Sequence, residues 1–156
     1  MKDQARRAFL LDIDNLAGAP RATEEEVKAV LQAVEAKYAL TSNDQVYCAA
    51  TAKAAFWVKK HRPGFDVKVG RGKDGSDLRL LEAGNPAWLK SQFSQVVIGS
   101  GDGIFGDLAK TLVELGVEVE VTCGHGIMAR SIHRLATSYE QPRIIRLARL
   151  NFAVAA

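Results

Sequence analysis

The stretch Ala8-Phe9-Leu10-Leu11-Asp12-Ile13-Asp14 decides the fold of this chain. It is almost entirely apolar and ends in carboxylates, a pattern typical of a strand that is buried on both faces and reaches solvent at its carboxyl end. Strands of this kind occur almost only in parallel sheets that are covered by helices. We therefore expect residues 8–13 to form a central parallel strand.

Strand and helix patterns alternate along the rest of the chain. Thr23 and Glu26 form a capping-box sequence, which predicts a helix that runs to Tyr38. The pair Asn85-Pro86 indicates that one helix ends and another begins. Further strands are expected at residues 45–49, 65–69, 95–98, 117–121 and 144–147, and further helices at residues 52–61, 76–82, 105–115 and 127–137.

This alternation indicates the fold class. Strands separated by helices of about 10–15 residues are typical of βαβ units. We expect an α/β fold, a three-layer Rossmann-like domain with a mainly parallel central sheet of about five to six strands. The length of 156 residues favours one domain over residues 1–156. The composition, 47% hydrophobic and 25% charged, excludes disordered, collagen-like and coiled-coil proteins.

The first apolar run and the cysteines bear on the cellular compartment. The run that ends at Asp12 is too short for a signal-peptide core or a membrane span. Neither export nor a membrane partner is therefore expected. Cys48 and Cys123 lie far apart and form no C-x-x-C pair, which favours reduced thiols and a cytoplasmic location.

The formal charge of +3 is unevenly distributed. Residues 51–73 hold seven bases and one acid, and residues 129–150 hold five arginines and one acid. The remainder of the chain is acidic, so the chain combines two basic regions, one of them in the C-terminal segment 129–156, with an acidic remainder. The small net charge hides this uneven distribution, which is the feature that needs a functional explanation.

Several carboxylates fall where the predicted strands end. Asp12 and Asp14 close the first strand, Asp102 follows the strand at residues 95–98, and Asp77 begins a helix. The carboxyl ends of parallel strands meet at one edge of the sheet, where ligands bind. Clustered carboxylates repel one another unless a cation neutralises them, and Mg²⁺ or Mn²⁺ prefers oxygen ligands. The sequence therefore predicts a metal site suited to phosphoryl transfer.

Other roles fit some of the polar residues near these strand ends. Asp77 and Asp107 would each complement a helix dipole as first-turn acids, and Asp102 is suited to forming a turn. Asn15 would orient the carboxylates or bond to its own backbone, and Ser100 would hold Asp102 or contact a phosphate. The sequence has no zinc-ligand spacing, P-loop, nucleophile elbow or dinucleotide-binding motif.

Three blocks of the sequence resemble the NYN domain, a branch of the PIN-like nuclease superfamily. The run from Phe9 to Leu16 resembles the opening strand of that family with its D-x-x-N ending. Lys73-Asp74-Gly75-Ser76-Asp77-Leu78 resembles its K-G-x-D segment, and the run from Val96 to Phe105 resembles its S-G-D-x-D-F block. The resemblance spans residues 9–121. It implies a PIN-like Rossmann fold, a divalent-metal site and ribonuclease activity.

The resemblance also implies roles for individual residues. It places catalytic and metal-binding carboxylates at Asp12, Asp77 and Asp102, with Asn15 supporting the first of them. The cofactor it implies is Mg²⁺ or Mn²⁺, and the expected enzyme is an endoribonuclease.

One position departs from the family pattern. The second acid of S-G-D-x-D-F falls on Ile104 in this chain, so one carboxylate is missing. Asp14 or Asp107 would have to compensate, and neither follows from the motif. With fewer ligands the metal would bind weakly or only together with the substrate.

The basic regions fit a nuclease, because an RNA backbone needs cationic surface beside the carboxylates. Arg71 and Lys73 lie in the loop before Asp77 and are the better candidates for RNA binding, ahead of Lys59 and Lys60 at a helix end. The arginines of the C-terminal segment suit RNA contact and an ordinary solvated face equally. A homodimer would lengthen a basic groove.

Two other functions stay open on the sequence alone. Asp12-Ile13-Asp14 resembles the nucleophile and acid pair of the haloacid dehalogenase superfamily, although Leu16 stands where that superfamily usually has Thr or Val. In such a phosphatase Asp12 would form a phosphoaspartate. The third hypothesis is a non-enzymatic RNA-binding or protein-interaction module that retains the fold without an acid at position 104.

Overall fold

The strand β1 (Arg7–Asp12) lies at the centre of a parallel sheet. A computed structural model describes residues 6–70 and 75–152, and for residues 76–78 the backbone only. Within these residues six strands form one sheet in the order β3-β2-β1-β4-β5-β6, every neighbouring pair being parallel. The other strands are β2 (Gln45–Ala50), β3 (Asp66–Val69), β4 (Gln95–Gly99), β5 (Glu118–Cys123) and β6 (Ile145–Arg149).

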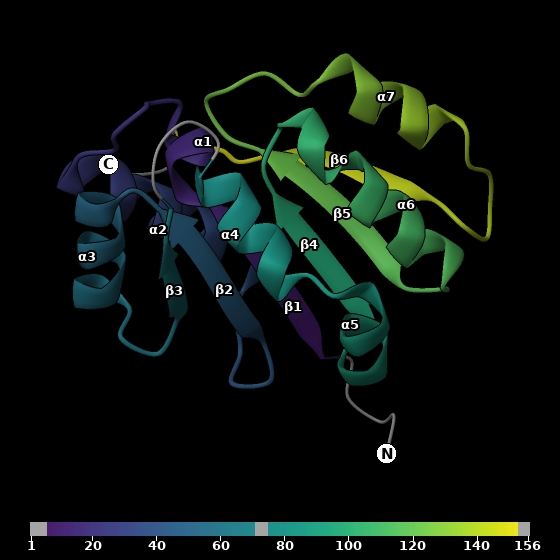
Figure 1. Cartoon of the computed structure of the whole chain (residues 1–156), viewed down its shortest axis with the longest axis horizontal. Coiled ribbons are helices and arrows are strands. Elements are labelled where there is room, and N and C mark those ends of the chain that lie inside the picture. Colours follow the sequence, from purple (N-terminus) through teal and green to yellow (C-terminus); the bar gives the residue numbers. More distant parts are fainter. Residues whose placement is uncertain (1–5, 71–74, 153–156) are drawn as a thin grey trace.

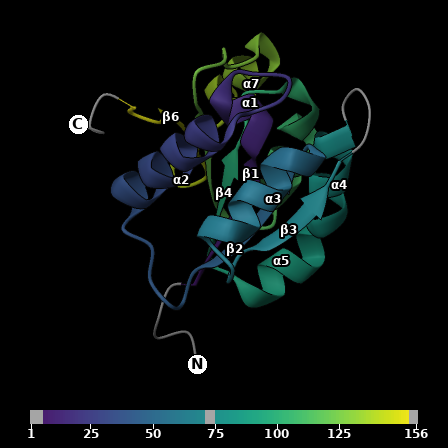
Figure 2. The ribbon, with the colours of Figure 1, turned by 90° about the vertical axis from the view of Figure 1, so that its left-hand side faces the viewer.

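Helices cover both faces of this sheet (Figures 1 and 2). Phe9 and Leu11 of β1 pack in one buried cluster with the helices α1, α2 and α3, whereas Leu10 packs in a second cluster with α4, α5, α6 and α7. The helices are α1 (Ile13–Ala17), α2 (Glu24–Tyr38), α3 (Ala52–His61), α4 (Gly75–Ala83), α5 (Pro86–Gln92), the 3₁₀ turn η1 (Gly103–Phe105), α6 (Gly106–Glu114) and α7 (Arg130–Thr137). The predicted three-layer Rossmann-like α/β fold is confirmed.

Local signals in the sequence account for most helix boundaries. The Thr23 side chain accepts a hydrogen bond from the Glu26 N–H, and the Glu26 side chain accepts one from the Thr23 N–H, which completes the predicted capping box. The Asn85 side chain caps α5 by accepting from the Trp88 N–H, with Pro86 in the first turn. None of the described helices is long and apolar enough to cross a membrane.

The predicted end of the first strand is wrong by one residue. The strand ends at Asp12, and Ile13 already begins α1, so Asp14 lies on a helix rather than at the strand end. Gly18 ends α1 in the left-handed conformation, with φ of 71°, and its N–H donates to the Asn15 carbonyl. A short apolar run fits a buried helical turn as well as a strand, and for that reason the sequence pattern does not separate them.

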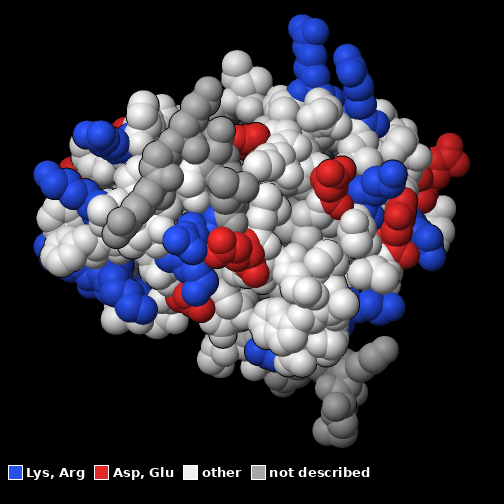
Figure 3. Space-filling model, viewed as in Figure 1, with Lys and Arg blue, Asp and Glu red and all other residues white. Residues whose placement is uncertain are grey.

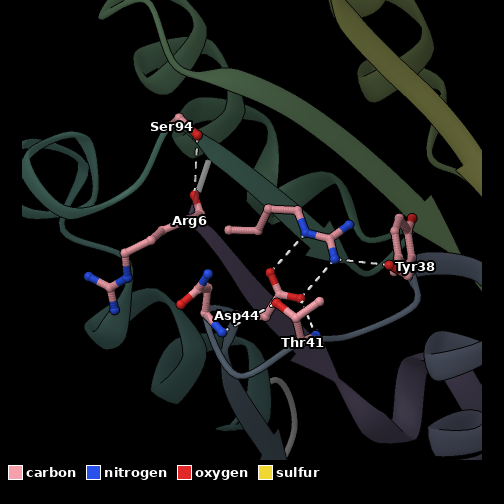
Figure 4. A network of polar contacts seen from close by, with 7 residues as sticks. Arg6, Tyr38, Thr41, Asp44 and Ser94 are labelled. Carbon is pink, nitrogen blue, oxygen red and sulfur yellow. Dashed lines mark hydrogen bonds and ion pairs between the residues drawn. The ribbon is translucent and has the colours of Figure 1, made fainter. Parts of the chain in front are cut away.

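An ion pair at the amino edge of the sheet joins β1 to the turn before β2 (Figure 4). The Arg7 guanidinium donates to both Asp44 oxygens, at 2.9 and 2.7 Å, and to the Tyr38 carbonyl at 2.9 Å. The Asp44 carboxylate also accepts from the Thr41 N–H at 2.8 Å, and the Asp44 side chain is only 2% exposed. Although burial acts to raise the pKa of Asp44, these donors outweigh it and hold that pKa below its ordinary value.

We predict that Arg7→Gln destabilises the protein by about 1–3 kcal/mol at neutral pH, because it leaves a buried carboxylate short of donors. A group with a lowered folded-state pKa contributes stability above its unfolded pKa of about 4 and loses it as the pH falls through its folded pKa. Urea unfolding of the wild type should therefore show a loss of stability on acidification that is shallower in Arg7→Gln. An identical pH dependence in both proteins would show that this pair is not responsible.

Candidate functional site

The carboxyl ends of β1 and β4 form the point where the strand order reverses. From β1 the chain continues to β2 on one side, and from β4 it continues to β5 on the other. In open parallel sheets, ligands bind at this point. The register pairs Leu11 with Gly99, so that Asp12 and Ser100 follow at equivalent positions of strands about 5 Å apart.

Asp12 is the last residue of β1 and is only 3% exposed. Side chains alternate along a strand, so Asp12 is on the same face as Leu10, which packs in one cluster with Leu80 of α4. The first turn of α4 contains Asp77. The Asp77 side chain lies outside the described residues, so its predicted convergence with Asp12 stays a prediction.

Asp14 ties three segments together through hydrogen bonds. Its Oδ1 accepts from the Ala22 N–H at 2.9 Å and from the Thr51 hydroxyl at 3.0 Å, and its Oδ2 accepts from the Thr51 N–H at 2.8 Å. With 8% of its surface exposed, the carboxylate holds the loop before α2 and the start of α3 against α1. Sequence reasoning missed Thr51, although its position directly after the strand at residues 45–50 placed it at this edge.

The loop between β4 and η1 is held from α1. The Asn15 Oδ1 accepts from the Gly101 N–H at 3.0 Å. Within the loop, the Ser100 Oγ accepts from the Asp102 N–H at 3.2 Å, and the Asp102 Oδ1 accepts from the Ile104 N–H at 3.0 Å. Asp102 therefore forms a turn, as the sequence suggested. Its second oxygen, Oδ2, has no hydrogen-bond partner among the described residues.

The loop after β5 packs tightly on the loop that carries Asp102. The Ala129 N–H donates to the Gly101 carbonyl at 2.8 Å, and a Cβ atom at Gly101 would lie 2.5 Å from the Ile127 carbonyl oxygen. Glycine is therefore required at position 101. The Arg149 side chain donates to the carbonyls of Gly124 and Gly126, at 2.7 and 3.0 Å, and so holds the loop in place from β6.

The remaining acid and the substituted position lie just beyond this loop. Ile104 is 38% exposed on η1, and Asp107 is exposed in the first turn of α6. Among the described residues, no three His, Cys, Asp or Glu side chains come together in a group that would hold a metal ion. The predicted metal ligands are Asp12, Asp77 and Asp102. The Asp77 side chain lies outside the described residues, so this set stays a prediction.

The lysines predicted to bind RNA are not brought beside Asp12. Lys59 and Lys60 lie at the end of α3, about 12 Å along the helix from its start, and α3 covers the face of the sheet opposite to that of Asp12. Lys59 donates to the Phe65 carbonyl at 2.8 Å, and Lys60 donates to Glu24 at 3.1 Å. Arg71 and Lys73, the other two candidates, lie outside the described residues.

The fold and this edge define a Rossmann-like α/β protein with polar side chains at the switch point. No family model matches the chain, and no curated protein matches it. A solved structure of a protein of unknown function from Vibrio parahaemolyticus is similar, with 16% sequence identity and a TM-score of 0.60. The similarity covers 97% of this chain and 96% of that chain. At this identity the similarity shows the fold alone.

We predict that Asp14→Ala destabilises the protein by about 2–6 kcal/mol, because it leaves the N–H groups of Ala22 and Thr51 without an acceptor at a cost of about 1–3 kcal/mol each. Glu140→Ala removes an exposed carboxylate and should change the free energy of unfolding by less than about 0.5 kcal/mol. Thermal or urea unfolding measures both. Equal stability of the two variants would contradict the anchoring role of Asp14.

Proposed function

We propose that this protein is a Mg²⁺- or Mn²⁺-dependent ribonuclease that hydrolyses RNA phosphodiester bonds at the carboxyl edge of β1 and β4. One observation carries the proposal: the register of β1 and β4 brings Asp12 beside the loop of Asp102 at the point where the strand order reverses. The resemblance of the blocks around Asp12, Asp77 and Asp102 to a metal-dependent nuclease family supports the same site.

The donor groups at this edge suit a hard divalent cation. Mg²⁺ is usually bound by one or two carboxylates together with waters and substrate phosphates. Asp12 and Asp102 would hold it, with Asp77 as the further ligand that the resemblance implies. When bound, such an ion neutralises charge on the phosphodiester and lowers the pKa of a bound water.

The other polar residues would position these carboxylates. Asn15 and Ser100 hold the Asp102 loop through the N–H groups of Gly101 and Asp102. Asp14 anchors α1, from which Asn15 projects. Because Ile104 provides no carboxylate, fewer protein ligands are available, and metal binding would depend more strongly on the substrate phosphate.

The geometry of Asp14 weighs against the phosphatase alternative. In that mechanism the Asp14 carboxyl would have to contact the leaving group of the substrate in order to transfer a proton. Both Asp14 oxygens are instead engaged by hydrogen bonds from Ala22 and Thr51, which hold the side chain against the protein backbone. We therefore place Asp14 among the positioning residues of the proposed nuclease.

The proposal predicts metal-dependent cutting of labelled RNA. Asp12→Asn and Asp102→Asn should each lower the cleavage rate by at least about 100-fold, because each removes negative charge from the metal site. Glu118→Gln, which neutralises an exposed acid at the opposite end of the strands, should cut as the wild type does. Gel analysis with Mg²⁺, with Mn²⁺ and with chelator gives the rates.

Other outcomes would contradict the nuclease. Undiminished cutting in chelator or in Asp12→Asn would refute the metal site. Salt-sensitive RNA binding without cutting under any metal condition would favour the non-enzymatic module. Hydrolysis of a phosphomonoester with a trapped aspartyl phosphate at Asp12 would favour the phosphatase.

A further inference from the structure

The helix α7 begins in direct contact with the candidate site. The Ala129 N–H, just before α7, donates to the Gly101 carbonyl at 2.8 Å. A Cβ atom at Gly103 would lie 2.7 Å from the Ser131 Oγ. The first turn of α7 is therefore packed against the loop that carries Asp102.

Two exposed arginines lie on α7. Arg130 and Arg134 are four residues apart, so their Cβ atoms lie on one helix face about 6 Å apart, while Ile132 is fully buried against the core. In the described part of the chain neither guanidinium has a carboxylate within ion-pair distance. Figure 3 shows two basic side chains projecting from the surface over α7.

The basic residues at the end of α3 are committed differently. Lys60 pairs with Glu24 at 3.1 Å, and Arg62 pairs with Glu35 at 2.5 Å. Both acids lie on α2, so ion pairs neutralise these two bases where α2 and α3 pack. An anionic ligand that binds Lys60 or Arg62 would have to displace the α2 carboxylates. On α7 it would meet arginines that have no ion-pair partner in the described chain.

The loop before α7 presents an exposed apolar side chain three residues before Arg130, and an aromatic pair farther back, next to the end of α1. Ile127 is 87% exposed, although its loop is held by Arg149 and by the Gly101 carbonyl. The exposed His125 ring stacks on Phe152 with ring centroids 3.9 Å apart. Held side chains of this kind provide packing surface for unpaired bases, which duplex RNA keeps inside its helix.

We propose that Ile127, Arg130 and Arg134, here called the α7 surface, bind a single-stranded segment of RNA next to the phosphodiester at the carboxyl edge. The arginines contact backbone phosphates, and Ile127 contacts an unpaired base. The inference rests on the proposed function for the chemical class of the substrate. It assigns RNA binding to α7 instead of the end of α3.

The test measures binding of a fluorescent single-stranded RNA of about 12 nucleotides by anisotropy, in chelator to prevent cutting. The double variant Arg130→Gln, Arg134→Gln should bind at least about tenfold more weakly at about 0.1 M salt, and its salt slope should fall by about 1.4, or 0.7 for each lost phosphate contact. Ile127→Ser should weaken binding about threefold or more. Unchanged thermal unfolding of these variants would show that the fold is intact.

The matched control removes the same charge elsewhere. Lys37→Gln with Lys90→Gln changes exposed lysines near the amino ends of the strands and should alter affinity less than twofold. Unchanged binding in the α7 double variant, a larger loss in Lys59→Gln with Lys60→Gln, tighter binding of a matched duplex, or no RNA binding by the wild type would each overturn the inference.

Cleavage separates this inference from the proposed function. Metal-dependent cutting that the α7 double variant leaves unchanged at low RNA concentration would overturn the inference and leave the nuclease standing. RNA binding that depends on the α7 arginines, without cutting by the wild type, would support the inference and overturn the nuclease.

Discussion

Parallel pairing of β1 with both β2 and β4 is the constraint on which the rest of the structure depends. Parallel neighbours cannot be joined by a tight turn, so each connection crosses a face of the sheet, usually through a helix. The connections that follow β1 place α2 and α3 on one face, and those before and after β4 place α4 to α7 on the other. The two sets of connections leave the sheet in opposite directions at Asp12. Every candidate site residue in the described chain lies on a segment that starts at the carboxyl edge of the sheet, although Lys59 and Lys60 lie at the far end of theirs.

The carboxyl edge is organised by hydrogen bonds between segments that are distant in the sequence. Asp14 joins α1 to the start of α3, Asn15 joins α1 to the Asp102 loop, and Arg149 joins β6 to the loop after β5. Each bond ties a loop backbone to another segment, and the Asn15 bond holds the loop that carries Asp102 next to α1, which directly follows Asp12. Such preorganisation is what a metal or phosphate site requires.

Charge is distributed in a way that the net value of +3 conceals. On one side of the molecule, acids of α2 pair with bases of α3 and stabilise the packing of the two helices. On the other side, α7 presents arginines that have no ion-pair partner in the described chain. Acidic groups lie between, at the strand ends. This arrangement puts uncommitted positive charge next to the carboxylates that would hold a metal.

The sequence by itself determined the layered α/β fold and the placement of Asp12 and Asp102 at one edge, because hydrophobic runs, the capping box at Thr23 and the break at Asn85-Pro86 are local signals. It placed the end of β1 one residue too late, since an apolar run fits a helical turn equally well. The sequence also predicted that the last helix begins at residue 127. In the structure, α7 begins at Arg130, and the residues just before it pack on Gly101. Only the tertiary structure decided that Asp14 is an anchor for Thr51. It alone also decided that Lys60 and Arg62 pair with acids of α2, while the α7 arginines have no ion-pair partner in the described chain. Those roles depend on partners brought close by long-range packing, and the spacing of residues along a chain does not encode which distant groups will meet.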